Sequence, residues 1–348
     1  MVKTIINQKG ATVSPDTISE FDEDTLPGME NSKEVNWIQS LSLELRTVIL
    51  ESMGRHLDKI EEIRLRLDRP LLLRLGDTEV TVSKDKKATF NLKNGIIVTS
   101  KELEKSIEIL SQSSLYAWED ELKNGYLTIP GGHRVGVVGR VVLENGLIKT
   151  LKEISGLNYR FGREVIGCAD KIMPYVINKD KIYHTLIISP PQCGKTTLLR
   201  DIIRQLSDGV ESLRFCGVNV GLVDERSEIA GAFQGQPQFS IGIRTDVLDA
   251  CPKAQGMIML IRAMSPRIVA TDEIGKPEDI DALNQTLQAG VSVLTTVHGN
   301  SFEEIEQQQV LNELLSSKFF ERLIILSRRQ GVGTLEAVYD GKSFERLC

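Results

Sequence analysis

The chain has 348 residues, of which 41% are hydrophobic and 26% charged, so it is long enough for two globular domains with sizeable cores. Its formal net charge of −6 disfavours nonspecific nucleic-acid binding, which depends on basic surfaces that displace counterions. The 5 cysteines and 4 histidines are dispersed, a pattern typical of reduced thiols in a cytosolic protein without a zinc site. No apolar run reaches the roughly 18 residues that suggest a membrane span, and the N-terminus lacks the pattern of a secretory signal.

The N-terminal segment, residues 1–35, is poor in large apolar side chains and contains the acidic run EFDEDTLPGMEN. Such a segment buries too little apolar surface to offset the conformational entropy lost on ordering. We therefore expect a mobile tail.

Residues 36–165 combine helical and strand patterns. WIQSLSLELRTVILES repeats apolar residues at helical spacing, and EEIRLRLDRPLLLRLGD alternates as a half-buried strand that breaks at Pro70. A second helix is predicted from Ser100 to near Gly125. A series of strands and turns follows, with Gly131–Gly132 and Asn145–Gly146 as turn signals. These patterns predict a small α+β domain.

Residues 166–348 instead alternate strands with helices. The segments HTLIIS, FCGVNVGLVD, RIVATD, SVLTTV and RLIILS are short, branched and apolar, which is typical of buried parallel strands. We predict an α/β domain with a mostly parallel, doubly wound sheet. The last residues, GTLEAVYDGKSFERLC, predict a β-hairpin that turns at Asp340–Gly341.

The stretch LIISPPQCGKTTLLRD resembles a phosphate-binding loop, G-x-x-x-x-G-K-[ST], with Ser189 in place of the first glycine. It lies between a predicted strand and a predicted helix, where the helix N-terminus would attract a phosphate. Lys195 would reach the β- and γ-phosphates of ATP, and the Thr196 hydroxyl would bind Mg²⁺. The candidate nucleotide-binding residues are Ser189, Pro190, Pro191, Gln192, Cys193, Gly194, Lys195, Thr196 and Thr197.

Acidic residues follow two other predicted strands. In PRIVATDEIG, we assign Asp272 to the metal and Glu273 to the attacking water. In VGLVDERSEIAG, Asp224, Glu225 and Arg226 could approach the γ-phosphate side of the same crevice. The patterns leave open whether Glu225 or Glu273 is the general base.

A fourth polar cluster ends the strand in VLTTVHGN. It contains Thr295, Thr296 and His298, and we expect His298 to sense the γ-phosphate. Ligands of open α/β sheets bind at the carboxyl ends of the strands, where all four clusters are predicted to meet. The sequence therefore predicts an ATP site with Mg²⁺.

From these motifs, with EEIRLRLDRPL, GGHRVGVVGR and NYRFGREVIGCADKIMPY upstream, the chain resembles the stage III sporulation AA family of endospore-forming bacteria. It is more distantly similar to the type II and type IV secretion ATPases. The resemblance covers most of the chain from about Trp37. It implies a RecA-like P-loop ATPase domain in a cytoplasmic homohexamer. Such a ring would drive a secretion-like channel, with membrane-protein partners, between mother cell and forespore.

The secretion ATPases also supply names for the motifs. Their Walker A loop corresponds to Lys195 and Thr196, their Walker B motif to Asp272 and Glu273, and their His box to His298. Their acidic Asp box corresponds to Asp224, Glu225 and Arg226. Those ATPases commonly have Gly-Glu at the Walker B position, so Glu273 is the firmer match.

Ring ATPases place an arginine of one subunit at the nucleotide of the next. The candidates are Arg140, Arg160, Arg163 and Arg244, although each taken singly is more simply a surface or salt-bridged residue.

Two other functions compete with the motor. One is a nucleic-acid-dependent ATPase, suggested by four arginines in the first domain, although a solvated sheet face explains their alternation with apolar residues more simply. The other is a nucleotide-gated structural ring with little turnover. The four arginines are Arg64, Arg66, Arg69 and Arg74.

Overall fold

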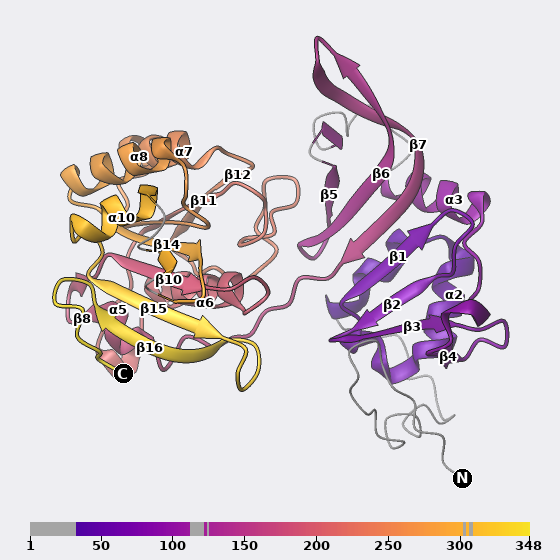
Figure 1. Cartoon of the computed structure of the whole chain (residues 1–348), viewed down its shortest axis with the longest axis horizontal. Helices are drawn as coiled ribbons and strands as arrows, with labels where there is room; N and C mark the ends of the chain where they lie inside the picture. Colours follow the sequence, from indigo (N-terminus) through magenta and orange to yellow (C-terminus); the bar gives the residue numbers. More distant parts are fainter. Residues whose placement is uncertain (1–32, 112–121, 124, 302–303, 306–308) are drawn as a thin grey trace. The chain divides into compact units, whose positions relative to one another are not determined.

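The computed structural model describes residues 33–111, 122–123, 125–301, 304–305 and 309–348. The chain divides into two compact units, Met1–Phe161 and Gly162–Cys348, coloured along the sequence in Figure 1. Residues 1–32 of the predicted tail and most of the second half of the helix predicted over 100–125 lie outside the described residues. Among those described, no helix is long and apolar enough to cross a membrane.

The first unit is built on a seven-stranded sheet in the order β4-β3-β2-β1-β7-β6-β5, whose neighbouring strands are all antiparallel. Side chains from the strands and from α2 and α3 form its core. Its helical elements include η1 (Lys33–Ser40), α2 (Leu43–Met53), η2 (Gly54–Lys59), η3 (Leu92–Asn94) and α3 (Ser100–Leu110). Its strands are β1 (Glu62–Arg66), β2 (Leu72–Leu75), β3 (Thr78–Val82), β4 (Ala88–Thr89), β5 (Tyr126–Ile129), β6 (His133–Glu144) and β7 (Leu147–Arg160).

Local patterns explain these elements. In β1, Ile63 and Leu65 are fully buried, as the alternation predicts. Thr99, one residue before the predicted helix start, caps α3 through a capping box with Glu102. The predicted turn at Asn145–Gly146 is confirmed: both residues have positive φ, and the long strands β6 and β7 pair on either side of it.

The second unit contains a seven-stranded sheet in the order β12-β11-β13-β14-β10-β15-β16. All neighbouring pairs are parallel except β15 and β16, which confirms the prediction of a mostly parallel α/β sheet. Its strands include β8 (Ile177–Asn178), β9 (Lys181–Ile182), β10 (Thr185–Ser189), β11 (Val220–Asp224), β12 (Thr245–Asp249), β13 (Ile268–Thr271), β14 (Ser292–His298), β15 (Arg322–Ser327) and β16 (Thr334–Asp340).

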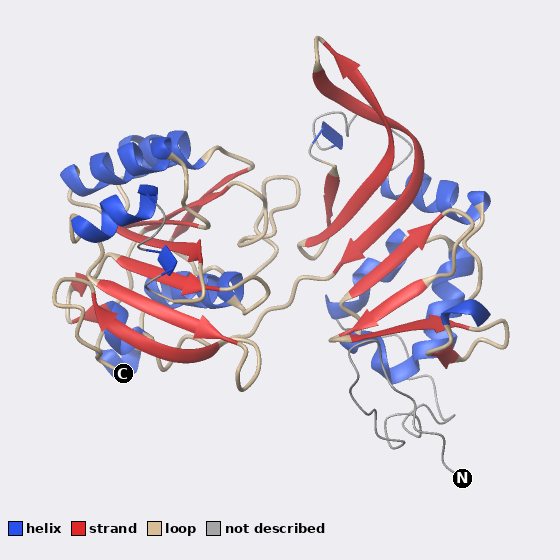
Figure 2. Cartoon of the chain, in the orientation of Figure 1, coloured by secondary structure: helices blue, strands red, loops and turns tan. Residues whose placement is uncertain are grey.

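Helices cover both faces of this sheet, as Figure 2 shows. One core holds Ile187 of β10 with α5 and α6, and a second holds Leu186 and Ile188 with α7, α8 and α10. Successive strand residues point to opposite faces, so the apolar run TLIIS supplies both cores. The helical elements include α5 (Met173–Val176), α6 (Lys195–Asp208), η5 (Glu211–Leu213), α7 (Lys253–Met264), α8 (Pro277–Gln288) and α10 (Gln309–Ser316).

Two details differ from the sequence-based expectation. Strand β12, which pairs with β11 at the sheet edge, was not predicted, because its sequence TDVLD shows neither a continuous apolar run nor an alternation of polar and apolar residues. The expected hairpin at Asp340–Gly341 forms in part. Strand β16 pairs with β15, and beyond the turn the chain returns along β16 through an antiparallel bridge between Tyr339 and Arg346 and a backbone hydrogen bond between Leu347 and Val338.

Candidate functional site

The carboxyl ends of three parallel strands bring the predicted motifs to one edge of the second unit's sheet. Strand β10 ends at Ser189, which pairs in register with His298 at the end of β14. Strand β13 pairs with the other side of β14 and leads into Asp272 and Glu273. The sheet register therefore places these separate segments side by side.

The loop between β10 and α6 has the backbone of a tight turn. Gln192 and Gly194 both have positive φ, and a Cβ on Gly194 would lie 3.0 Å from Val332 Cγ1. Gly194 is thus required both by its backbone angle and by the close approach of the loop after β15. Ser189 is fully buried in β10 and its hydroxyl donates to the Pro190 carbonyl, so the strand end accommodates serine in place of glycine.

Lys195 is the first residue of α6 and is buried. Its Nζ lies 3.0 Å from Glu273 Oε1 and 3.1 and 3.2 Å from the two ring nitrogens of His298. His298 Nε2 is itself 2.7 Å from the same carboxylate oxygen. Three residues from three motifs thus form one charged cluster at the N-terminus of α6, where unpaired backbone N–H groups favour an anion.

Glu273 is held in a strained conformation. Its φ is +36°, in the region that residues with a Cβ avoid, and its backbone N–H donates to the Thr296 hydroxyl. Burial raises the pKa of the Glu273 carboxyl, but the hydrogen bond and charge of Lys195, helped by His298 and Arg226, outweigh burial and leave the pKa below its usual value. This carboxylate is therefore ionised and fixed in position.

Asp272 has the features of a metal ligand. Its side chain is almost fully buried, and its Oδ1 has no hydrogen-bond partner in the described part of the chain. Burial, with the nearby charge of Asp224, raises the pKa of Asp272 to about 7. Mg²⁺ that arrives with a nucleotide needs only one or two protein oxygens, and the buried, unpartnered oxygen of Asp272 fits that requirement.

Asp224 organises the backbone. Its two carboxylate oxygens accept hydrogen bonds from the backbone N–H groups of residues 228, 229 and 230, at 2.8–3.0 Å. Although burial raises its pKa, all three contacts favour the ionised form. Asp224 therefore fixes the loop after β11, and its approach to the γ-phosphate stays a prediction.

Glu225 and Arg226, the neighbours of Asp224, have different partners. Glu225 forms an ion pair with the buried Lys253 at the start of α7. Arg226 lies 3.5 Å from the second oxygen of Glu273. Arg226 thus joins the Lys195 cluster, whereas Glu225 is held by a different cation.

Three of the arginine candidates have partners of their own in the described part of the chain. Arg244 donates to the Ser207 carbonyl in the last turn of α6, roughly 18 Å of helix away from Lys195 at 1.5 Å per residue. In the first unit, Arg140 pairs with Glu153 and Arg160 with Glu62. The structure therefore does not bring Arg244 to the site of its own chain.

Several of the other predicted site residues are buried or hydrogen-bonded within the protein. Cys193 is buried, with its carbonyl accepting from the Gly333 N–H, and the Thr197 carbonyl accepts from the Cys168 thiol. Thr295 is fully buried, and its hydroxyl has no partner among the described residues. Pro190 is half-buried, and Pro191 and Gln192 are exposed at the loop tip.

Two positioning residues were not anticipated from the sequence. Lys253 carries the Glu225 ion pair, and Arg200 of α6 donates to the carbonyls of residues 163, 228 and 229. Arg200 thereby ties helix α6 to the loop that Asp224 organises. Arg200 lies just beyond the G-K-T of the loop stretch and Lys253 near a helix start, and a single cation at such a position carries no signal of its own.

Comparison of the sequence with known proteins identifies its family. The family model for sporulation stage III, protein AA matches residues 29–346. The chain is 43% identical over 305 residues to the stage III sporulation protein AA of Bacillus subtilis (strain 168), covering 85% of this chain and 94% of that protein. It is also 30% identical over 215 residues to the uncharacterized protein ycf45 of Porphyra purpurea, covering 60% of this chain and 36% of that protein.

Two solved structures share the fold at low sequence identity. The Yersinia pseudotuberculosis ATPase DotB aligns with a TM-score of 0.53 and 12% identity over 87% of this chain and 80% of that one. The pilus retraction motor PilT, solved with ADP, aligns with a TM-score of 0.50 and 14% identity over 82% and 77%. The sequence match decides the family: the chain belongs to the sporulation stage III, protein AA family.

Proposed function

We propose that this protein is a Mg²⁺-dependent ATPase whose RecA-like P-loop domain, residues 166–348, binds ATP at the loop between β10 and α6. The observation that carries the proposal is the convergence of Lys195, Glu273 and His298 on the N-terminus of α6. A cation for phosphate and a fixed carboxylate beside one helix start match parts that phosphoryl transfer to water uses, and the histidine contacts both of them.

In this proposal the loop backbone and α6 hold the phosphates. Lys195 exchanges its contact with Glu273 for the β- and γ-phosphate oxygens, and Thr196 and Asp272 bind Mg²⁺. Bound there, Mg²⁺ would neutralise charge that develops on the phosphate oxygens. Release from Lys195 leaves Glu273 free to accept a hydrogen bond from the attacking water.

Glu273 is the general base in preference to Glu225. Its N–H is fixed by Thr296 and its carboxylate already contacts Lys195, whereas Glu225 is paired with Lys253. His298, in contact with both Lys195 and Glu273, would respond when the γ-phosphate leaves. His298 is therefore the residue through which hydrolysis is passed to β14 and the segment beyond it.

We further propose that the ATPase works as a homohexameric motor of a secretion-like complex between mother cell and forespore, recruited from the cytoplasm by membrane proteins. Membership of a sporulation family and the fold shared with the ATPase DotB and the motor PilT support this role. A neighbouring subunit would supply an arginine, with Arg140, Arg160, Arg163 and Arg244 as candidates.

One experiment tests the proposal: native mass and ATPase rate measured together, with and without Mg-ATP. A mass that rises in step with specific activity is expected if the site is completed between subunits. A ring that binds ATP without turnover would contradict the ATPase and favour a structural ring. A rate that depends on added DNA or RNA would instead favour a nucleic-acid-dependent enzyme.

A further inference from the structure

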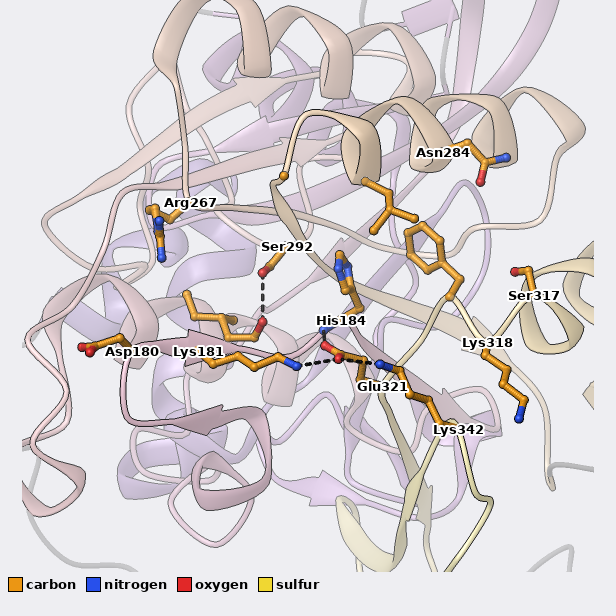
Figure 3. A pocket seen from close by; sticks show the side chains of 14 residues that line it. Asp180, Lys181, His184, Arg267, Asn284, Ser292, Ser317, Lys318, Glu321 and Lys342 are labelled. Carbon is orange, nitrogen blue, oxygen red and sulfur yellow. Dashed lines mark hydrogen bonds and ion pairs between the residues drawn. The ribbon is translucent and has the colours of Figure 1, made fainter.

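A second polar cavity lies at the opposite edge of the second unit's sheet, at the amino ends of the strands. It has a volume of about 470 Å³ and is lined by His184 before β10, Arg267 before β13 and Ser292 at the start of β14, among others (Figure 3). The candidate ATP site lies at the carboxyl ends of these same strands. The cavity is therefore separate from the site already described.

The cavity carries a surplus of positive charge. Its lining includes four cations, Lys181, Arg267, Lys318 and Lys342, against the carboxylates of Asp180 and Glu321. Its charged side chains therefore sum to about +2, although the whole chain carries −6. A local field opposite in sign to that of the whole protein favours an anionic ligand at this place.

The pairing of these charges leaves two cations available. The buried Glu321 carboxylate accepts from Lys181 at 2.7 Å and from Lys342 at 3.3 Å. For Arg267 and Lys318, by contrast, the described residues provide no side-chain hydrogen bond or ion pair, and both side chains are exposed. A guanidinium presents a planar set of N–H donors that matches the oxygens of a phosphate.

His184 adds a polar group inside the cavity. Its Nδ1 is buried without a hydrogen-bond partner in the part of the chain that is described, and a buried polar atom of this kind costs free energy unless a ligand or water meets it. Burial lowers the pKa of His184, so the ring is neutral at pH 7. The ring also packs against Phe319, with 5.2 Å between ring centroids.

We propose that this cavity binds a small phosphate monoester whose organic part packs on its apolar wall. A phosphate monoester carries about −1.5 to −2 charges at pH 7, which matches the net positive charge of the side chains that line the cavity. The volume exceeds that of a phosphate group alone and falls in the range of small-molecule sites. Ile182, Leu287 and Phe319 supply the apolar surface for the organic part.

The test is a ³¹P NMR titration of the full-length chain with phenyl phosphate. The chain carries Lys195→Ala so that the proposed ATP site does not compete, and the result does not depend on whether ATP is hydrolysed. Saturable binding of one equivalent is expected. Arg267→Ala and, separately, Lys318→Ala should each weaken it about tenfold, the effect of losing one hydrogen bond to a charged group.

The matched control is Arg262→Ala, which removes an exposed arginine of α7 outside this cavity and should leave the affinity unchanged. Arg267→Ala is expected to fold, since within the described ranges Arg267 hydrogen-bonds only through its backbone. Absence of saturable binding would overturn the proposal, as would equal losses in Arg262→Ala and Arg267→Ala. Inorganic phosphate or phenylacetate binding as tightly as phenyl phosphate would overturn the assignment to a monoester.

Discussion

Lys195 Nζ and Glu273 Oε1 are 3.0 Å apart, so the cation proposed to hold the phosphates is paired with the carboxylate proposed to activate water. Both side chains are largely buried, with 7% and 24% of their surface exposed, which strengthens the pair relative to one at the surface. In the proposed function, ATP binding would exchange this ion pair for a contact between Lys195 and phosphate. The two proposed roles are thereby linked through a single contact.

Replacing the lysine tests the phosphate contact. Lys195→Ala should weaken ATP binding by about 10- to 100-fold, the range expected when hydrogen bonds to a charged group are lost. Equilibrium binding of a fluorescent ATP analogue measures the change. Lys171→Ala, which removes an exposed lysine of the same unit, is the control and should bind normally. Full affinity in Lys195→Ala would refute the phosphate-loop assignment.

The two glutamate candidates can be separated by a matched pair of amide substitutions. Glu273→Gln should lower the hydrolysis rate at least about 100-fold and retain ATP binding, because general bases contribute roughly 10²–10⁴-fold. Glu225→Gln should retain most of the rate, since it changes an ion pair with Lys253. Single-turnover hydrolysis measures both. The reverse order of effects would move the base to Glu225.

The assignment of Asp272 to Mg²⁺ predicts a loss of metal dependence without a loss of ATP binding. Asp272→Asn should abolish the stimulation of hydrolysis by Mg²⁺ while ATP still binds in the presence of EDTA, because the amide is a weaker ligand for Mg²⁺ than a carboxylate. The hydrolysis rate is measured as a function of Mg²⁺ concentration. An unchanged Mg²⁺ dependence would exclude Asp272 as a ligand.

Alanine substitutions at two glycines of similar φ can distinguish the effect of backbone strain from the effect of crowding in the loop between β10 and α6. Gly194 and Gly235 have φ of +81° and +76°, but only at Gly194 would a Cβ approach a neighbour, Val332 Cγ1 at 3.0 Å. Each alanine variant should lose about 1–2 kcal/mol of unfolding free energy from the left-handed conformation. Gly194→Ala should also weaken ATP binding, and Gly235→Ala should not. Equal ATP affinities would contradict the close-packed loop.

The first unit should lose stability in mild acid because of His133. Burial lowers its pKa to about 4, against about 6.5 in the unfolded chain. Above pH 6.5 both states are neutral and nothing changes. Between pH 6.5 and 4 only the unfolded state binds the proton, so the unfolding free energy decreases as the pH is lowered. The total decrease is about 3 kcal/mol at most, and below pH 4 the unfolding free energy decreases no further from this cause.

Urea unfolding at pH 7.5 and 4.5 measures this loss. Tryptophan fluorescence reports the first unit, because both tryptophans, Trp37 and Trp118, lie within Met1–Phe161. In His133→Phe, which keeps an aromatic ring beside Phe161, the difference between the two pH values should shrink by about 2.5 kcal/mol, the part of the loss reached at pH 4.5. An unchanged difference would show that His133 does not carry the effect.

The sequence predicted the parallel sheet and the elements around the candidate site because their signals are local. Buried parallel strands are continuous apolar runs such as TLIIS, and Asn145–Gly146 specifies its turn by backbone preference alone. Strand β12 escaped prediction because it is an edge strand, half-buried along its whole length. Its pairing with β11 depends on a neighbour distant in sequence.

In the candidate site, too, local motifs could be predicted from the sequence and contacts between distant segments could not. Motifs at strand ends identified Lys195, Glu273 and His298, and the sheet register brings them together. The sequence could not distinguish the surroundings of two acids in one motif. Asp224 faces three backbone N–H groups and Glu225 faces Lys253, and these partners depend on how the loop after β11 and the start of α7 pack.

Strand β15 and the turn after it contact a strand and a loop that are synthesised much earlier in the chain. Strand β15 pairs directly with β10, and in the turn the Gly333 N–H donates to the Cys193 carbonyl in the loop between β10 and α6. On the ribosome the loop is synthesised well before both β14 and β15, the strands that flank β10. Until those segments emerge, β10 has neither neighbour, so a chain stalled before β15 would expose an apolar strand edge of the kind that chaperones and proteases recognise.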